Sequence, residues 1–224
     1  MSKSILRGRP ALNASVCLLN SALFLGCAPE DKMTWHDFYN KGIEHHEAKE
    51  FGTAIEAYSK VIHDLRLDLD EFSSTDSTLC EAYRLRGLAR MRMSIDSLGR
   101  FYLNGIDGNN AILLDKSDAG RDRERLDDDR PYRLAVGDFT HAMAVKEDYF
   151  GDKVQIQLYL SRAMAYYLLG EFEHSVADYT AVLALDPKCG EALHNRGCVY
   201  MCLNNREKAE QDFKNARTRG IHQD

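Results

Sequence analysis

The stretches that decide the fold are YLSRAMAYYLLGEFEHSVADYTAVLALDP at residues 159–187 and LHNRGCVYMCLNNREKAEQDFKNARTRGI at residues 193–221. They repeat each other at a spacing of 34 residues, which pairs Ala163 with Gly197, Tyr166 with Tyr200, Ser175 with Ala209, and Tyr179 with Phe213. Small residues recur where two helices must approach closely, and aromatic residues recur where the space between helices must be filled. A period near 34 with this alternation predicts an array of helix-turn-helix repeats with a concave groove.

The full set of matching positions identifies the kind of repeat. The earlier stretch supplies Tyr159, Ala163, Tyr166, Ser175, Tyr179, Val182 and Pro187, and the later one supplies Leu193, Gly197, Tyr200, Ala209, Phe213, Ala216 and Ile221. Within each helix this spacing puts the side chains on one face. The pattern resembles the tetratricopeptide repeat, which places large apolar, small and aromatic residues at repeat positions 4, 8 and 11, and small, aromatic and small residues at 20, 24 and 27. The resemblance implies an all-α, right-handed superhelix.

The same template fits upstream with one interruption. A first repeat contains Phe38, Gly42, His45, Ala54, Tyr58 and Val61, and a second contains Tyr83, Gly87, Arg90, Ala135, Phe139 and Ala142. Arg90 and Ala135 are 45 residues apart, whereas a regular repeat has nine between these positions, so an insertion of about 36 residues is expected there. We predict repeats at about 35–66, 80–147, 156–189 and 190–221 within a domain of residues 35–220, with the insertion at 93–130. Met93 to Leu103 is expected to prolong the first helix of the second repeat.

Composition narrows the function classes. The chain has 224 residues, 44% of them hydrophobic and 29% charged, with a formal net charge of -6 and no basic block, which argues against nucleic-acid binding. Its eight His residues are scattered over different predicted helices, and neither a nucleophile motif nor a glycine-rich phosphate loop occurs. We therefore expect no enzyme activity, no cofactor and no metal site.

The N-terminal segment has the layout of an export signal. Lys3, Arg7 and Arg9 precede an apolar stretch, Ala11 to Leu25, which is too short for a typical membrane-spanning helix. The stretch ends in Gly26-Cys27, which resembles a bacterial lipobox, although the preceding Phe24 and Leu25 depart from it. The resemblance implies a lipoprotein signal peptide at 1–26, lipid attachment at Cys27 and a tether at 27–34. A mitochondrial presequence, an uncleaved apolar helix or a misassigned start are the alternatives.

The cysteines of the body do not follow the usual pattern of exported proteins. Cys80, Cys189, Cys198 and Cys202 could in principle pair, as thiols in oxidising compartments usually do. Cys198 and Cys202 lie one helical turn apart, a spacing that fits disulfide geometry poorly. We expect free, buried thiols, with a Cys189 link to Cys198 or Cys202 as the alternative.

A partner-binding surface follows from the resemblance. The family directs positions 5 and 9 of each first helix toward the concave groove. In this sequence these are Tyr39, Ile43, Arg84, Leu88, Leu160, Met164, His194 and Cys198. We call these the predicted groove residues, and their apolar character suits an amphipathic or extended segment of a partner polypeptide. The alternative is that the insertion or the chain's own terminus fills the groove.

The functional prediction is a non-enzymatic adaptor or scaffold, held at a membrane by its lipid anchor in the cell envelope, facing the periplasm or the exterior. The carboxylate clamp of the chaperone-binding branch is not expected, because Tyr39, Ile43, Leu85, Gln157 and Ser161 stand where that branch needs Lys, Asn or Arg. Two alternatives remain open: a structural subunit of a larger complex, and a mitochondrial or cytoplasmic repeat protein whose insertion fills its own groove.

Overall fold

The computed structural model describes residues 33–67, 76–95, 102–103, 112–113, 128–145 and 151–221. Except for Met33, they belong to one compact unit, Thr34–Asp224. Its elements are α1 (Trp35–Glu47), α2 (Phe51–Leu67), α3 (Asp76–Ile95), β1 (Tyr102–Leu103), β2 (Ile112–Leu113), α4 (Arg130–Ala144), α5 (Asp152–Leu169), α6 (Phe172–Leu185), α7 (Gly190–Cys202) and α8 (Arg206–Arg217). The predicted signal peptide and Cys27 lie outside the described residues.

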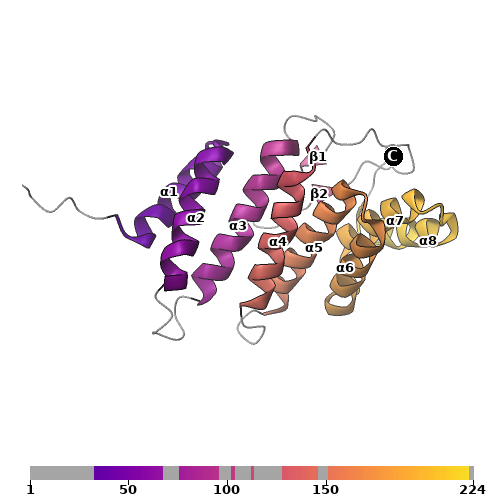
Figure 1. Cartoon of the computed structure of the whole chain (residues 1–224). Coiled ribbons are helices and arrows are strands. Elements are labelled where there is room, and N and C mark those ends of the chain that lie inside the picture. Colours follow the sequence, from indigo (N-terminus) through magenta and orange to yellow (C-terminus); the bar gives the residue numbers. More distant parts are fainter. Residues whose placement is uncertain are drawn as a thin grey trace, which may run out of the picture. The chain divides into compact units, whose positions relative to one another are not determined.

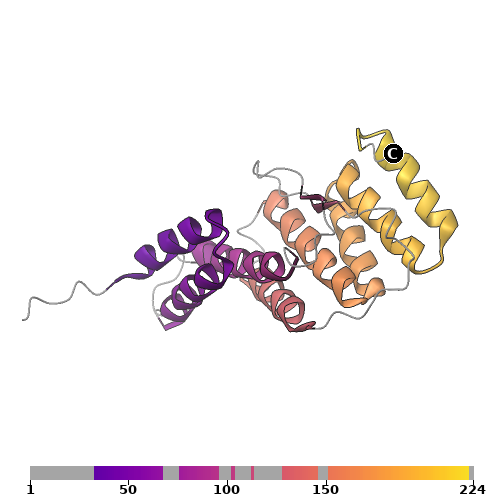
Figure 2. The same cartoon turned by 90° about the horizontal axis from the view of Figure 1, so that it is seen from above.

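The helices pack in the order of the chain. Each of α1 to α7 packs against the helix that follows it, and α3 also contacts α5, the first helix of the next repeat (Figure 1). Figure 2 shows the same succession of helix pairs from above. The described helices thus form four pairs, and the predicted all-α tetratricopeptide-repeat superhelix with an interrupted second repeat is confirmed.

Close approach of the two helices in a pair explains the small and aromatic positions. A Cβ added to Gly42 would lie 2.5 Å from the Tyr58 ring, and one added to Gly197 would lie 2.7 Å from the Phe213 ring. These distances are well inside ordinary carbon–carbon contact. The other small residues of the template, Ala54, Ala135, Ser175 and Ala209, are all fully buried. The pattern read from the sequence therefore reports real helix–helix contacts.

The first, third and fourth repeats also have the same turn between their two helices. Lys49, Gly170 and Asn204 occupy the same repeat position and have positive φ angles of 61°, 76° and 56°. In each case the next residue donates its backbone N–H to a carbonyl five residues back, at 2.8 to 2.9 Å. This bond closes the end of the first helix by the usual left-handed C-terminal cap.

The insertion begins later and differs in structure from the prediction. α3 ends at Ile95, and Tyr102 and Leu103 form a β-strand that pairs antiparallel with Ile112 and Leu113. The expectation that residues 93–103 prolong the helix therefore holds to Ile95 and is wrong at Tyr102 and Leu103. At Tyr102 and Leu103, pairing with β2 takes the place of helical backbone hydrogen bonds.

Candidate functional site

The eight predicted groove residues lie on the first helices of the four repeats, α1, α3, α5 and α7, but they differ in accessibility. Leu88, Met164, His194 and Cys198 are buried, with at most 4% of their surface exposed. Tyr39, Ile43, Arg84 and Leu160 remain partly exposed. The side chain at position 9 is therefore buried in three of the four repeats. The partly exposed side chains are mainly those at position 5.

Two of the polar groove residues are already engaged within the chain. Arg84 forms a bidentate ion pair with Glu81, with Nε and Nη2 lying 2.7 and 2.5 Å from the carboxylate oxygens. The Nε2 atom of His194 lies 3.6 Å from the Sγ atom of Cys198. Cys80 and Cys198 are buried, whereas Cys189 and Cys202 are only half-buried, and no disulfide joins these four residues in the described structure.

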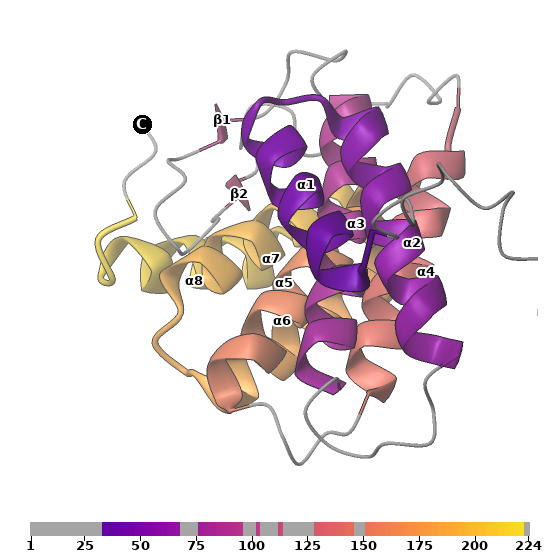
Figure 3. The same ribbon diagram turned by 90° about the vertical axis from the view of Figure 1, so that its left-hand side faces the viewer.

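The insertion reaches the last repeat. Its strand β2 packs against α7, the helix that carries His194 and Cys198 (Figure 3). Residues of the second repeat's insertion thus cover part of the fourth repeat, about 80 residues further along the chain. This contact therefore favours the alternative in which the insertion, and not a separate polypeptide, lies against the first helix of the fourth repeat.

His46 marks a desolvated spot on the first repeat. It follows the predicted groove residue Ile43 by one helical turn, and its ring packs edge-on against Phe51 at 5.5 Å between ring centroids. Burial lowers the pKa of His46 to about 4, and the positive charges of Arg92 and Arg84 on α3 act in the same direction. The imidazole is therefore neutral at physiological pH.

A recurring ion pair, which the sequence analysis missed, joins the two helices of three repeats. The guanidinium groups of Arg86, Arg162 and Arg196 bind the carboxylates of Asp138, Asp178 and Asp212, with shortest N–O distances of 2.7, 2.8 and 2.8 Å. The carboxylate side chains are at most 8% exposed, and the guanidinium groups 15 to 18%. The hydrogen bonds that Arg162 donates to Asp178 raise the pKa of Arg162 above its ordinary value, although burial opposes this rise.

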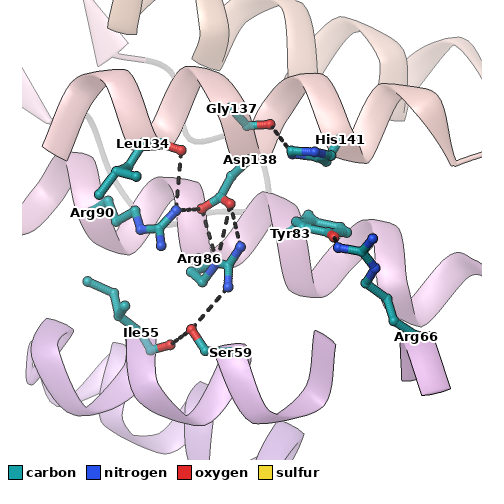
Figure 4. Close-up of polar contacts among 10 residues, drawn as sticks. All are labelled: Ile55, Ser59, Arg66, Tyr83, Arg86, Arg90, Leu134, Gly137, Asp138 and His141. Atoms are coloured by element: carbon teal, nitrogen blue, oxygen red, sulfur yellow. Dashed lines mark hydrogen bonds and ion pairs between the residues drawn. The ribbon is translucent and has the colours of Figure 1, made fainter. Parts of the chain in front are cut away.

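The same arginines also reach back to the preceding repeat. Nη1 of each donates a hydrogen bond to a hydroxyl on the previous second helix: Arg86 to Ser59 at 3.0 Å, Arg162 to Thr140 at 3.2 Å, and Arg196 to Thr180 at 3.1 Å. We call this set of arginines, aspartates and hydroxyl residues the Arg–Asp ladder. Figure 4 shows its first rung, where Asp138, Arg86 and Ser59 connect three helices.

The ladder could have been recognised from the sequence, because its residues recur at the repeat period. Arg162 and Arg196 are 34 residues apart, and so are Asp178 and Asp212. The segments Asp138-Phe139-Thr140 and Asp178-Tyr179-Thr180 share an acid, an aromatic ring and a hydroxyl in order. Polar residues that recur at the repeat period indicate contacts between repeats as clearly as apolar ones do.

Other chemistry is not evident in the part of the chain that the structure describes. Among its helices, none is both long and apolar enough to span a bilayer. The described residues also contain no group of three or more His, Cys, Asp or Glu side chains arranged to hold a metal ion.

Comparison with known proteins agrees with the fold. Residues 156–189 and 190–216 match the family model of the tetratricopeptide repeat. A crystal structure of MamA superposes with a TM-score of 0.57 at 17% identity, covering 85% of this chain and 80% of that one. A search among curated proteins found no match.

Two more distant solved structures are also similar. The tetratricopeptide-repeat domain of Arabidopsis OM64 aligns at 15% identity with a TM-score of 0.42, over 82% of this chain and 94% of that domain. The TPR2AB domain of yeast Sti1, in a structure described as a pHSP90 complex, aligns at 16% identity with a TM-score of 0.35, over 84% and 78% of the two chains. The matched segments and the helical stack together identify residues 156–216 as tetratricopeptide repeats and the described fold as a tetratricopeptide-repeat superhelix.

Proposed function

We propose that this chain is a non-enzymatic adaptor that holds a partner polypeptide on the inner side of its first helices. Repeat arrays of this kind generally serve as interaction modules, because their stacked helices present an extended curved surface. The observation that carries the proposal is the partly exposed row of side chains at position 5, with Tyr39 on α1, Arg84 on α3 and Leu160 on α5.

The chemistry of this row favours an apolar partner segment. Tyr39 and Leu160 offer apolar contact area, and Ile43 adds to it next to Tyr39 on α1. Arg84 contributes little free charge, because its guanidinium is held by Glu81. An amphipathic helix or an extended segment with large apolar side chains fits this surface better than an acidic chain terminus does.

A second candidate, a self-occupied surface, is favoured by one observation. Because β2 packs against α7, the insertion takes the place that a partner would take on the fourth repeat. In this alternative the array is a closed structural unit, either alone or within a larger complex, and the accessible part of the row is limited to α1, α3 and α5.

Photocrosslinking distinguishes these functions. Benzoylphenylalanine in place of Tyr39 or Leu160 should crosslink a separate polypeptide in the native cell, whereas the same group in place of Ala177, exposed on α6, should not. Leu160→Glu should abolish the crosslink formed from position 39. Crosslinks found only within the chain, to residues of the insertion, would contradict the adaptor function and support the self-occupied form.

Leu88 and Met164 are unsuitable for such tests. Both are nearly inaccessible, so a charged substitution would expose or strain the core instead of removing a partner contact. Leu160 is partly exposed, and a Glu side chain there can reach solvent. Circular dichroism of each variant provides the check that the fold persists.

We further propose that the adaptor is anchored to a membrane of the cell envelope through lipid on Cys27. The support is the sequence alone: basic residues, a short apolar stretch and Gly26-Cys27 precede the repeats. More than one acyl chain on this residue would give stable attachment. Labelled palmitate should enter the wild-type protein and not Cys27→Ser. Equal labelling, or none in either, would remove the anchor and favour a mitochondrial or cytoplasmic location.

A further inference from the structure

A basic pocket lies between α2, α3 and α4, apart from the predicted groove residues. Its volume is about 650 Å³, and residues from all three helices line it. The basic members of the lining are Arg66, Arg86, Arg90, Arg133, His63 and His141, and the acidic one is Asp138. Figure 4 shows Arg86 and Arg90 converging on Asp138, with Arg66 beside Tyr83.

Comparison between repeats shows how the second repeat differs at this pocket. In the third and fourth repeats, position 11 carries Tyr166 and Tyr200, whose ring centroids lie 5.9 and 5.8 Å from the guanidinium carbons of Arg162 and Arg196. In the second repeat this position is Arg90. The ring that would cover the ladder arginine is thus replaced by a second guanidinium, which binds the same carboxylate at 2.5 Å.

This replacement leaves a positive charge without a matching carboxylate. Asp138 is shared by two guanidinium groups, whereas Asp178 and Asp212 each bind one. Both arginines are about 15% exposed, so bulk solvent screens the surplus charge incompletely. Burial lowers the pKa of Arg90, and the charge of Arg86 adds to this effect against the opposing influence of Asp138.

A second uncompensated cation faces the same pocket. Within the described residues, Arg66 makes a single long hydrogen bond, from Nη1 to the Tyr83 hydroxyl at 3.5 Å, and forms no ion pair. Arg133, in contrast, is neutralised by Asp129 at 2.9 Å and Glu171 at 3.5 Å. Among the described residues, the net surplus is therefore two positive charges, one from the Arg86–Arg90–Asp138 cluster and one from Arg66.

The aromatic wall of the pocket is held in place. The rings of Tyr83 and His141 stack with 5.3 Å between centroids and an interplanar angle of 16°. Nδ1 of His141 donates to the Gly137 carbonyl at 2.7 Å, which fixes the ring orientation. The site is therefore lined by side chains that are positioned before any ligand arrives, which lowers the entropic cost of binding.

We propose that this pocket binds a phosphorylated ligand. Two surplus charges match a dianionic phosphoryl group better than a monoanionic carboxylate, and guanidinium groups bind phosphate oxygens in a bidentate manner. The volume exceeds that of inorganic phosphate and leaves room for a second phosphoryl group or for the group that carries the first. The site is independent of the proposed partner surface on the first helices.

The test uses the full-length protein and inorganic pyrophosphate as the probe. Calorimetric titration should show binding that sodium chloride of equal ionic strength does not reproduce. Arg66→Gln should raise the dissociation constant for pyrophosphate by about tenfold, as expected when a charge-assisted hydrogen bond is lost. Arg90→Tyr introduces the residue type of the third and fourth repeats and should raise the dissociation constant at least as much. Arg206→Gln, which removes an exposed charge on α8, should leave it unchanged.

The outcomes are decisive in either direction. Absence of pyrophosphate binding by the wild type, or equal weakening by Arg206→Gln and Arg66→Gln, would overturn the proposal. Should Arg90→Tyr fail to fold, Arg66→Gln still carries the test, because Arg66 is exposed. Competition by O-phosphoserine would assign the site to phosphorylated side chains, and pyrophosphate binding without such competition would assign it to diphosphate ligands. Both of these results support a phosphoryl site.

Discussion

The same Gly→Ala exchange at two positions, Gly197→Ala and Gly137→Ala, should change the free energy of unfolding in opposite directions. Both glycines lie inside helices, where alanine is favoured by up to about 1 kcal/mol. A Cβ at residue 137 would meet no atom within 4 Å, so the helix preference acts alone there. We expect Gly137→Ala to raise the free energy of unfolding by about 0.5 to 1 kcal/mol.

At Gly197 the same methyl group meets the second helix of its repeat. The added Cβ would lie 2.7, 2.9 and 3.1 Å from three carbons of the Phe213 ring, so ring or helix must move by about 0.8 Å to restore ordinary contact. Overpacking of this kind costs about 1 to 3 kcal/mol. After the helix preference is subtracted, Gly197→Ala should lower the free energy of unfolding by about 0 to 2 kcal/mol, which places it about 1 to 3 kcal/mol below Gly137→Ala.

Urea unfolding followed by circular dichroism at 222 nm measures both values. The chain has one tryptophan, Trp35 in α1, and its fluorescence reports the first repeat separately, which reveals whether the array unfolds in one transition. Adding Phe213→Leu should remove most of the penalty of Gly197→Ala, because the ring is the obstacle. If Gly197→Ala proved as stable as Gly137→Ala, the contact between Gly197 and Phe213 would not determine the spacing of the helices.

The remaining predictions concern the Arg–Asp ladder and His46. Asp178→Asn should destabilise the protein by about 2 to 4 kcal/mol in the same unfolding assay, because it leaves Arg162 mostly buried beside a neutral group, whereas Glu173→Gln on the exposed side of α6 should have little effect. Thr180→Val should cost about 0.5 to 1.5 kcal/mol by removing the acceptor for Arg196, while Lys214→Ala at the equivalent position of the last repeat should change stability by less than about 0.5 kcal/mol. His46 has a folded-state pKa near 4, below its unfolded value of 6.5, so the unfolded chain binds more protons between these values and stability falls as pH decreases from 6.5 to 4. The wild type should lose about 1 to 2 kcal/mol more than His46→Gln over this interval, after allowance for the partial exposure of the ring, and parallel pH profiles for the two proteins would contradict this.

The parts of the fold that followed from the sequence are those where one residue type is required by geometry. Gly42, Gly87 and Gly197 face Tyr58, Phe139 and Phe213 at distances that exclude a side chain. Such constraints recur at every repeat, so two clear copies were enough to locate the other two. The interruption of the second repeat was visible for the same reason, because Gly87 and Phe139 keep their roles although far apart in sequence.

The accessibility of the candidate site was harder to predict. Position 9 was expected to face an open groove, but Leu88, Met164 and Cys198 are buried. Their exposure depends on contacts with the neighbouring helices, and at α7 strand β2 of the insertion is packed as well. A single repeat template carries no information about a segment inserted within the repeat.

The Arg–Asp ladder explains how the array tolerates that segment. Arg162 and Asp178 are 16 residues apart, and Arg86 and Asp138, across the insertion, are 52 apart, yet Nε and Nη2 of the arginine bind the carboxylate in both pairs. Lengthening the closed loop by this factor costs only about 1 kcal/mol of chain entropy. The second guanidinium on Asp138, from Arg90, adds a further charge-assisted bond between α3 and α4, and its contribution is of a size that can offset that cost. The residue that makes the pocket basic therefore also compensates the helix pair for its interrupted connection, so Arg90→Tyr should weaken that pair even where it restores the regular repeat pattern.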